Sequence, residues 1–72
     1  MNLSNVIEGK EYKIVSIETN DEELDAFLFS LGCYSGEAIT VVSRTKSTCV
    51  LSIKDARYTI DNQLAEVITV EG

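Results

Sequence analysis

One stretch of the chain has the apolar spacing of an amphipathic helix, and it limits what the other residues can form. Four apolar side chains follow the i, i+3, i+4, i+7 spacing of one helix face: Leu24, Phe27, Leu28 and Leu31. Asn20 precedes Glu23 by three residues, which is the spacing of an N-cap and the carboxylate that pairs with it. Gly32 follows the stripe and can adopt the positive φ that ends a helix. We therefore predict a helix of about three turns that starts after Asn20 and ends at Gly32.

The stretches around this helix have the composition of β-strands. They are rich in β-branched and aromatic residues and are separated by polar or glycine-containing turns. Strands are predicted at Glu11–Glu18, Ala38–Arg44, Cys49–Ile53, Ala56–Ile60 and Glu66–Val70. The polar run Thr45–Thr48 and the pair Lys54-Asp55 are predicted as turns. Asp61–Ala65 is predicted to form a single helical turn before the last strand.

These elements predict a mainly β fold, a small five-stranded barrel with one short α-helix between the first and second strands. Sequential antiparallel strands in so small a chain curl into a partly closed barrel, because closure hides strand edges that invite aggregation. The apolar face of the helix is expected to cover one open end. The 72 residues contain no proline and no linker or repeat, so one domain spanning residues 1–72 is expected.

Composition argues against several classes of function. Twelve acidic and six basic residues give a formal charge of −6, which would repel a phosphate backbone, so nucleic acid is not expected as a ligand. No histidine is present to titrate near neutrality, and no enzymatic activity is expected. Cys33 and Cys49 lack the spacing of a zinc site, so we expect reduced thiols and no cofactor. No signal peptide or membrane-spanning run occurs, so a cytoplasmic protein without membrane insertion is expected.

Five acidic residues cluster between Glu18 and Asp25, at the predicted start of the helix. We interpret the cluster as a solvated helix start favoured by the helix macrodipole. The alternative is a specific acidic docking patch.

One aromatic side chain falls outside the apolar stripe. Phe29 projects roughly 150° from the centre of the stripe on a helix that advances about 100° per residue. Two interpretations are open: the N-terminal segment around Leu3 and Val6 covers the ring, or the ring is an exposed anchor. Exposed aromatic side chains beside a polar rim are typical of binding surfaces, so Phe29 with nearby Tyr34 is the best candidate for a contact patch.

The order of glycines and apolar residues along the whole chain resembles the FeoA family. The matching positions are Leu3-Ser4, Gly9-Lys10-Glu11-Tyr12, Leu28, Leu31-Gly32, Gly36, Ile60, Ala65, Ile68 and Val70. The resemblance implies an SH3-like barrel that serves bacterial ferrous iron uptake as a cytosolic accessory, with no enzymatic activity and no bound cofactor. It also implies that the chain docks on the cytosolic G-protein domain of the FeoB permease and regulates transport. A monomer is expected.

The chain departs from the family pattern at several surface positions. Phe27 stands where a basic residue is common, Cys33 at an apolar position and Ser35 at a proline position. Asp61 stands where arginine is frequent, and the loop Thr45–Thr48 is shortened. The helix end is expected to be the docking surface, with these candidate partner contacts: Phe27, Phe29, Cys33, Tyr34 and Ser35.

Two other functions remain as alternatives. An SH3-like protein-binding module could act on a different partner, such as a metal-dependent transcriptional regulator, because domains of this type bind peptide segments in such regulators. A metal or redox carrier would have to use Cys33 and Cys49, and two thiols without histidine make a poor Fe²⁺ site.

Overall fold

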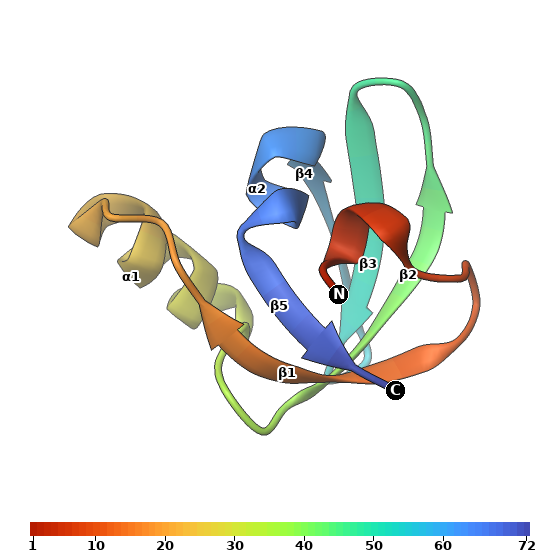
Figure 1. Cartoon of the computed structure of the whole chain (residues 1–72), viewed down its shortest axis with the longest axis horizontal. Coiled ribbons are helices and arrows are strands. Elements are labelled where there is room, and N and C mark those ends of the chain that lie inside the picture. Colours follow the sequence, from red (N-terminus) through yellow and green to blue (C-terminus); the bar gives the residue numbers. More distant parts are fainter.

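Five antiparallel strands form one sheet in the order β4-β3-β2-β1-β5 (Figure 1). The computed structural model describes all 72 residues. Its strands are β1 (Glu11–Ile17), β2 (Ala38–Arg44), β3 (Thr48–Ile53), β4 (Ala56–Asp61) and β5 (Ile68–Glu71). Register shifts interrupt the β1–β5 and β2–β3 pairings, and such bulges bend and twist a sheet. Because β4 and β5 are the two edge strands and do not pair, the barrel is partly open.

This architecture confirms the predicted mainly β fold with one helix between the first two strands. The helix α1 (Glu22–Leu31) lies between β1 and β2 in the chain. The predicted helical turn is α2 (Asn62–Glu66), which connects β4 to β5. A 3₁₀-helix, η1 (Leu3–Asn5), precedes β1 and was not expected from the sequence pattern.

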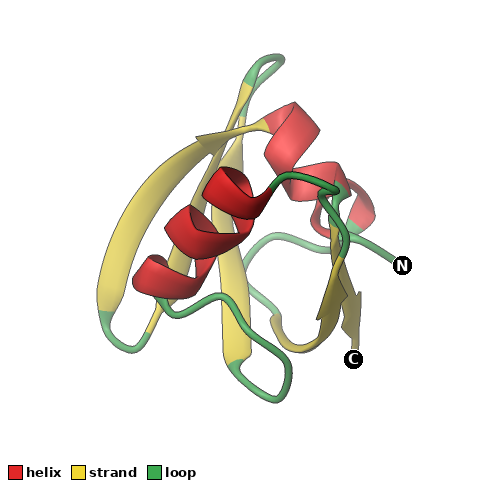
Figure 2. Cartoon of the chain, turned by 90° about the vertical axis from the view of Figure 1, so that its left-hand side faces the viewer, coloured by secondary structure: helices red, strands yellow, loops and turns green.

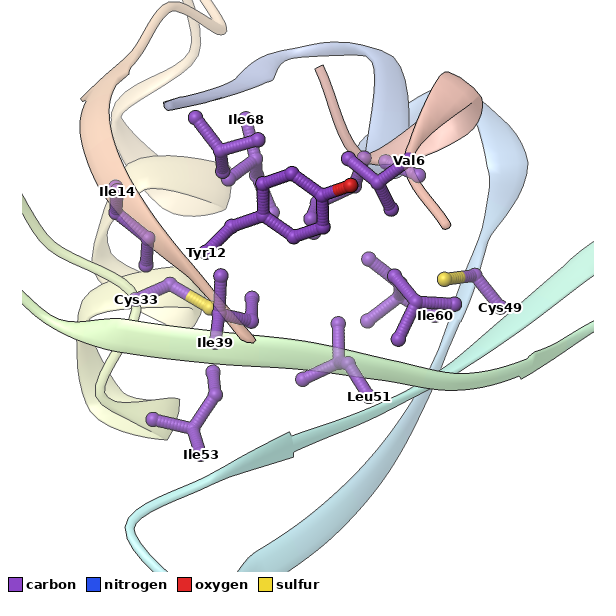
Figure 3. Packing of buried hydrophobic residues seen from close by; sticks show 14 of the residues in the cluster. Val6, Tyr12, Ile14, Cys33, Ile39, Cys49, Leu51, Ile53, Ile60 and Ile68 are labelled. Carbon is purple, nitrogen blue, oxygen red and sulfur yellow. The ribbon is translucent and has the colours of Figure 1, made fainter. Parts of the chain in front are cut away.

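Fifteen buried apolar side chains form the core, and no polar or charged side chain is buried with them (Figure 3). The strands supply most of them through the period-two alternation of a half-buried sheet, as in β3, where Cys49, Leu51 and Ile53 face inward. Leu28 is the one core residue that α1 contributes. The core therefore rests mainly on the sheet and on the segments that close it.

One end of the barrel is closed by η1 and α2, a closure that the sequence did not predict. Figure 1 shows η1 and α2 beside β5, whereas α1 lies on the far side next to β1. Of the apolar stripe on α1, only Leu28 is fully buried, and Phe27 is 46% exposed. Leu31 packs against the core from a partly buried position, so the helix covers the core as expected through Leu28 and Leu31 but not through Phe27.

Arg44 at the end of β2 fixes the N-terminal segment. Its guanidinium donates to the carbonyl oxygen of Leu3 at 2.9 Å and to that of Val6 at 2.8 Å. The backbone N–H of Val70 in β5 donates to the carbonyl of Met1 at 2.8 Å. These bonds hold Leu3 and Val6 in the core, where they are almost fully buried.

The start of α1 differs by one residue from the prediction. Asp21 is the N-cap, and its Oδ1 accepts hydrogen bonds from the backbone N–H groups of Glu23 at 2.9 Å and Leu24 at 3.3 Å. Asn20 instead has a φ of 58°, a left-handed conformation that asparagine tolerates. The predicted end is confirmed: Gly32 has a φ of 97° and closes the last turn.

Candidate functional site

Phe29, which is exposed, and Tyr34, which is half-buried, form an aromatic pair at the C-terminal end of α1, which we call the aromatic ridge. Their ring centroids are 5.1 Å apart and the planes are tilted by 39°, a favourable arrangement for two aromatic rings. Phe29 is 65% exposed. Figure 2 shows α1 from this side, with no other element in front of it.

The exposed interpretation of Phe29 is therefore correct, and coverage by the N-terminal segment is wrong. Leu3 and Val6 are buried in the core, at the barrel end closed by η1 and α2. Arg44 holds them there through the backbone bonds described above. Nothing from that segment reaches the ring of Phe29.

An open groove lies between the aromatic ridge and the β3–β4 hairpin, and we call it the hairpin groove. Its volume is about 470 Å³, and its lining is Phe29, Ser30, Leu31, Gly32, Tyr34, Ile53, Lys54, Ala56 and Tyr58. Lys54 is the charged residue of this lining. Its Nζ donates a hydrogen bond to the Tyr34 hydroxyl, lies 4.8 Å from the ring centroid and is 3.9 Å from Glu37 Oε1. The bond to Tyr34, with a smaller contribution from Glu37, raises the pKa of Lys54, so this cation is already engaged within the chain.

A second groove lies between the aromatic ridge and β1, and we call it the β1 groove. Its volume is about 300 Å³, and its lining is Val15, Ser16, Ile17, Asp25, Phe29, Cys33, Tyr34 and Ser35. Val15 is 42% exposed and points outward because it alternates with the buried Ile14. Asp25 is the charged residue of this lining, and its Oδ1 accepts a hydrogen bond from the Thr19 hydroxyl.

The structure brings four of the five predicted contact residues together. Phe29, Cys33, Tyr34 and Ser35 line the β1 groove. Phe27 lines neither groove, because two positions along an α-helix turn the side chain by about 200°.

Cys33 lies at the floor of this groove, but its side chain is 1% exposed and belongs to the core (Figure 3), which argues against a direct partner contact. Burial raises the pKa of the Cys33 thiol to about 11, so the thiol is protonated at neutral pH. Cys33 and Cys49 are both free and buried. A buried, protonated thiol does not offer a partner a contact surface or a nucleophile.

The sequence interpretation missed the groove residues that come from the sheet. Val15 lies on β1, and Ile53, Lys54 and Tyr58 belong to the β3–β4 hairpin. The outward position of Val15 follows from the alternation of β1 and could have been found. The approach of the hairpin to the end of α1 depends on sheet pairing that no local pattern encodes.

Two departures from the family pattern have structural roles. Asp61 is the N-cap of α2, and its Oδ1 accepts a hydrogen bond from the backbone N–H of Leu64 at 2.7 Å. The short loop after β2 is held by Asn62, whose side-chain amide donates to the carbonyls of Thr45 at 3.2 Å and Lys46 at 2.9 Å. Both positions lie away from the aromatic ridge and its grooves.

No group of three or more His, Cys, Asp or Glu side chains is arranged to hold a metal ion. No helix combines the length and the apolar character that crossing a membrane requires.

The comparisons with known proteins identify the family of the chain. The model of the FeoA domain matches residues 1–72. A comparison with the curated proteins gave no match.

Solved structures share the fold over almost the whole chain. The solution structure of iron(II) transport protein A from Clostridium thermocellum is 29% identical with a TM-score of 0.90, and the match covers 99% of this chain and 44% of that one. The FeoA of Stenotrophomonas maltophilia, solved with zinc and described as a procaryotic SH3 domain protein, is 17% identical with a TM-score of 0.86 over 99% of this chain and 89% of that one. A manganese-dependent transcriptional repressor is 18% identical with a TM-score of 0.90, covering 100% of this chain and 41% of the repressor. The fold is therefore SH3-like, and the chain spans less than half the length of the Clostridium protein.

Proposed function

The chain belongs to the FeoA family, and from this premise we propose that it is a non-enzymatic accessory of ferrous iron transport. It docks in the cytoplasm on the G-protein domain of a FeoB-type permease and regulates transport. A similar protein of known structure is called an iron(II) transport protein, which supports the link to ferrous iron.

The aromatic ridge is the observation that carries the docking proposal. Phe29 is 65% exposed beside Tyr34, with a groove on either side of the pair. Exposed aromatic side chains next to pockets are typical of the few residues that supply most of the affinity at a protein interface. Regulation follows if the docked chain prefers one of two states of the partner, because equal affinity for both states would shift nothing.

The two phenylalanines of α1 provide a matched test. Phe29→Ala should weaken binding to the purified G domain of the permease about thirtyfold, because losing an interface anchor costs roughly 2 kcal/mol. Phe27→Ala removes a partly exposed ring of the same size from the other side of the helix and should change the affinity less than about twofold. Isothermal titration calorimetry measures both, with circular dichroism as the check that each variant is folded.

The docking proposal is contradicted if the unaltered chain does not bind the G domain. Equal effects of the two substitutions would also contradict the use of the aromatic ridge, because only Phe29 belongs to it.

The alternative partner is a metal-dependent transcriptional regulator, which this chain would bind in trans. The motivating observation is the likeness of the fold to a domain within a manganese-dependent transcriptional repressor. Titration with a purified regulator of this type from the same organism separates the two proposals. Binding to the regulator in the absence of binding to the permease would favour the alternative.

A further inference from the structure

The carboxylates at the start of α1 have no cationic partner within the chain. The single ion pair of the molecule joins Lys54 to Glu37, outside this region. One carboxylate oxygen of Asp21 accepts the hydrogen bonds that cap the helix, whereas Glu22 and Asp25 do not cap it. Their charges are therefore available to another molecule.

Two of these carboxylates share the helix face of Phe29. Glu22, Asp25 and Phe29 follow the i, i+3, i+7 spacing, which aligns side chains along one face. The macrodipole favours acids anywhere in the first turn and is indifferent to the face they occupy. Asp25 also lines the β1 groove together with Phe29, so one carboxylate of this face lies at the groove itself.

The two grooves beside the aromatic ridge differ in charge. In the hairpin groove, Lys54 is engaged by Tyr34 and Glu37. In the β1 groove, the side chain of Asp25 accepts a hydrogen bond from the neutral Thr19 hydroxyl and forms no ion pair. The apolar part of the β1 groove includes Val15, 42% exposed, and Phe29, 65% exposed. This groove therefore combines exposed apolar surface with negative charge that no residue of the chain neutralises.

We infer that the β1 groove receives a basic segment of a protein partner. An apolar side chain of that segment packs between Val15 and Phe29, and a neighbouring lysine or arginine faces Asp25 and Glu22. Opposite charges across an interface set its register and speed association, which suits a chain with a net charge of −6. The inference rests on the proposed function only for the identity of the partner.

A pair of charge reversals tests the inference against the permease G domain. Glu22→Lys places a cation on the face of Phe29 and should weaken binding at least about tenfold at low ionic strength. Glu23→Lys makes the same change in net charge in the same helical turn, but the side chain lies about 100° further around the helix. It should weaken binding less than about threefold, and the difference should shrink in high salt because exposed charges are screened. Equal losses for both variants would overturn the inference while leaving docking intact.

A peptide probe tests the inference without the permease. The probe is an acetylated and amidated peptide of two leucines flanked by arginines, and the control replaces the arginines by glutamates. With ¹⁵N-labelled chain, the arginine peptide at millimolar concentration should shift the amide resonances of Val15, Asp25 and Phe29, and the glutamate peptide should not. Equal responses to both peptides, or no response, would overturn the inference. If the arginine peptide binds here but the G domain does not bind, the proposed partner is wrong and the groove assignment stands.

Discussion

At the scale of single residues, Cys33 shows how burial changes chemistry. It follows the glycine that ends α1, and its side chain turns into the core, where 1% of it is exposed. An apolar environment disfavours the charged thiolate, so the pKa of Cys33 rises from 9.0 to about 11. Burial also raises the pKa of Cys49, although the nearby Arg44 opposes part of that effect.

The buried thiol predicts a loss of stability in alkaline solution. The unfolded chain releases the Cys33 proton near pH 9.0, whereas the folded chain holds it until about pH 11. Below pH 9.0 the thiol therefore does not lower the free energy of unfolding. As the pH rises from 9.0 towards 11, the free energy of unfolding falls, by about 2 kcal/mol at roughly pH 10.5. Urea unfolding near pH 8 and near pH 10.5 measures this change in the free energy of unfolding, with Cys33→Ala as the variant that lacks the thiol. An equal pH dependence in the variant would contradict this account.

At the scale of elements, the end of α1 was predicted correctly, whereas its start and the segment before β1 were not. Gly32 ends α1 as predicted, because a helix stop needs only a residue that tolerates positive φ. The start was misplaced because Asn20 and Asp21 are adjacent and both are good N-caps, and backbone conformation decides between them. The 3₁₀-helix η1 was missed although it has a local signal: the Asn2 side chain accepts from the backbone N–H of Ser4, and the Asn5 side chain accepts from that of Asn2. Arg44, distant in sequence, then bonds to the carbonyls of this segment.

The corrected cap gives a test at the start of α1. Asp21→Ala removes the acceptor for two backbone N–H groups and should lower the free energy of unfolding by about 1 kcal/mol. Asn20→Gly keeps the left-handed conformation accessible and should change stability by less than about 0.5 kcal/mol. Chemical denaturation of both variants decides between the caps. A larger drop in the free energy of unfolding for Asn20→Gly than for Asp21→Ala would show that Asn20 is the N-cap.

At the scale of the whole molecule, the closed end and the exposed ridge lie on different sides of the barrel. Arg44, η1 and α2 close one end, while α1 lies on another side of the molecule (Figures 1 and 2) and carries the aromatic ridge at its C-terminal end. Phe29, Tyr34 and Ser35 were predictable as part of this surface because they come from one stretch of sequence. Val15 and Tyr58 were not named, since the sheet brings them to the ridge from two separate strands.

Uptake of radiolabelled ferrous iron tests the central claim most directly. The strain lacks the gene for this chain and is complemented with the unaltered gene, with Phe29→Ala or with Phe27→Ala at equal protein levels. The account predicts that deletion changes uptake, that the unaltered chain and Phe27→Ala restore it, and that Phe29→Ala leaves it near the level of the deletion strain. Full restoration by Phe29→Ala, or unchanged uptake on deletion, would contradict the account.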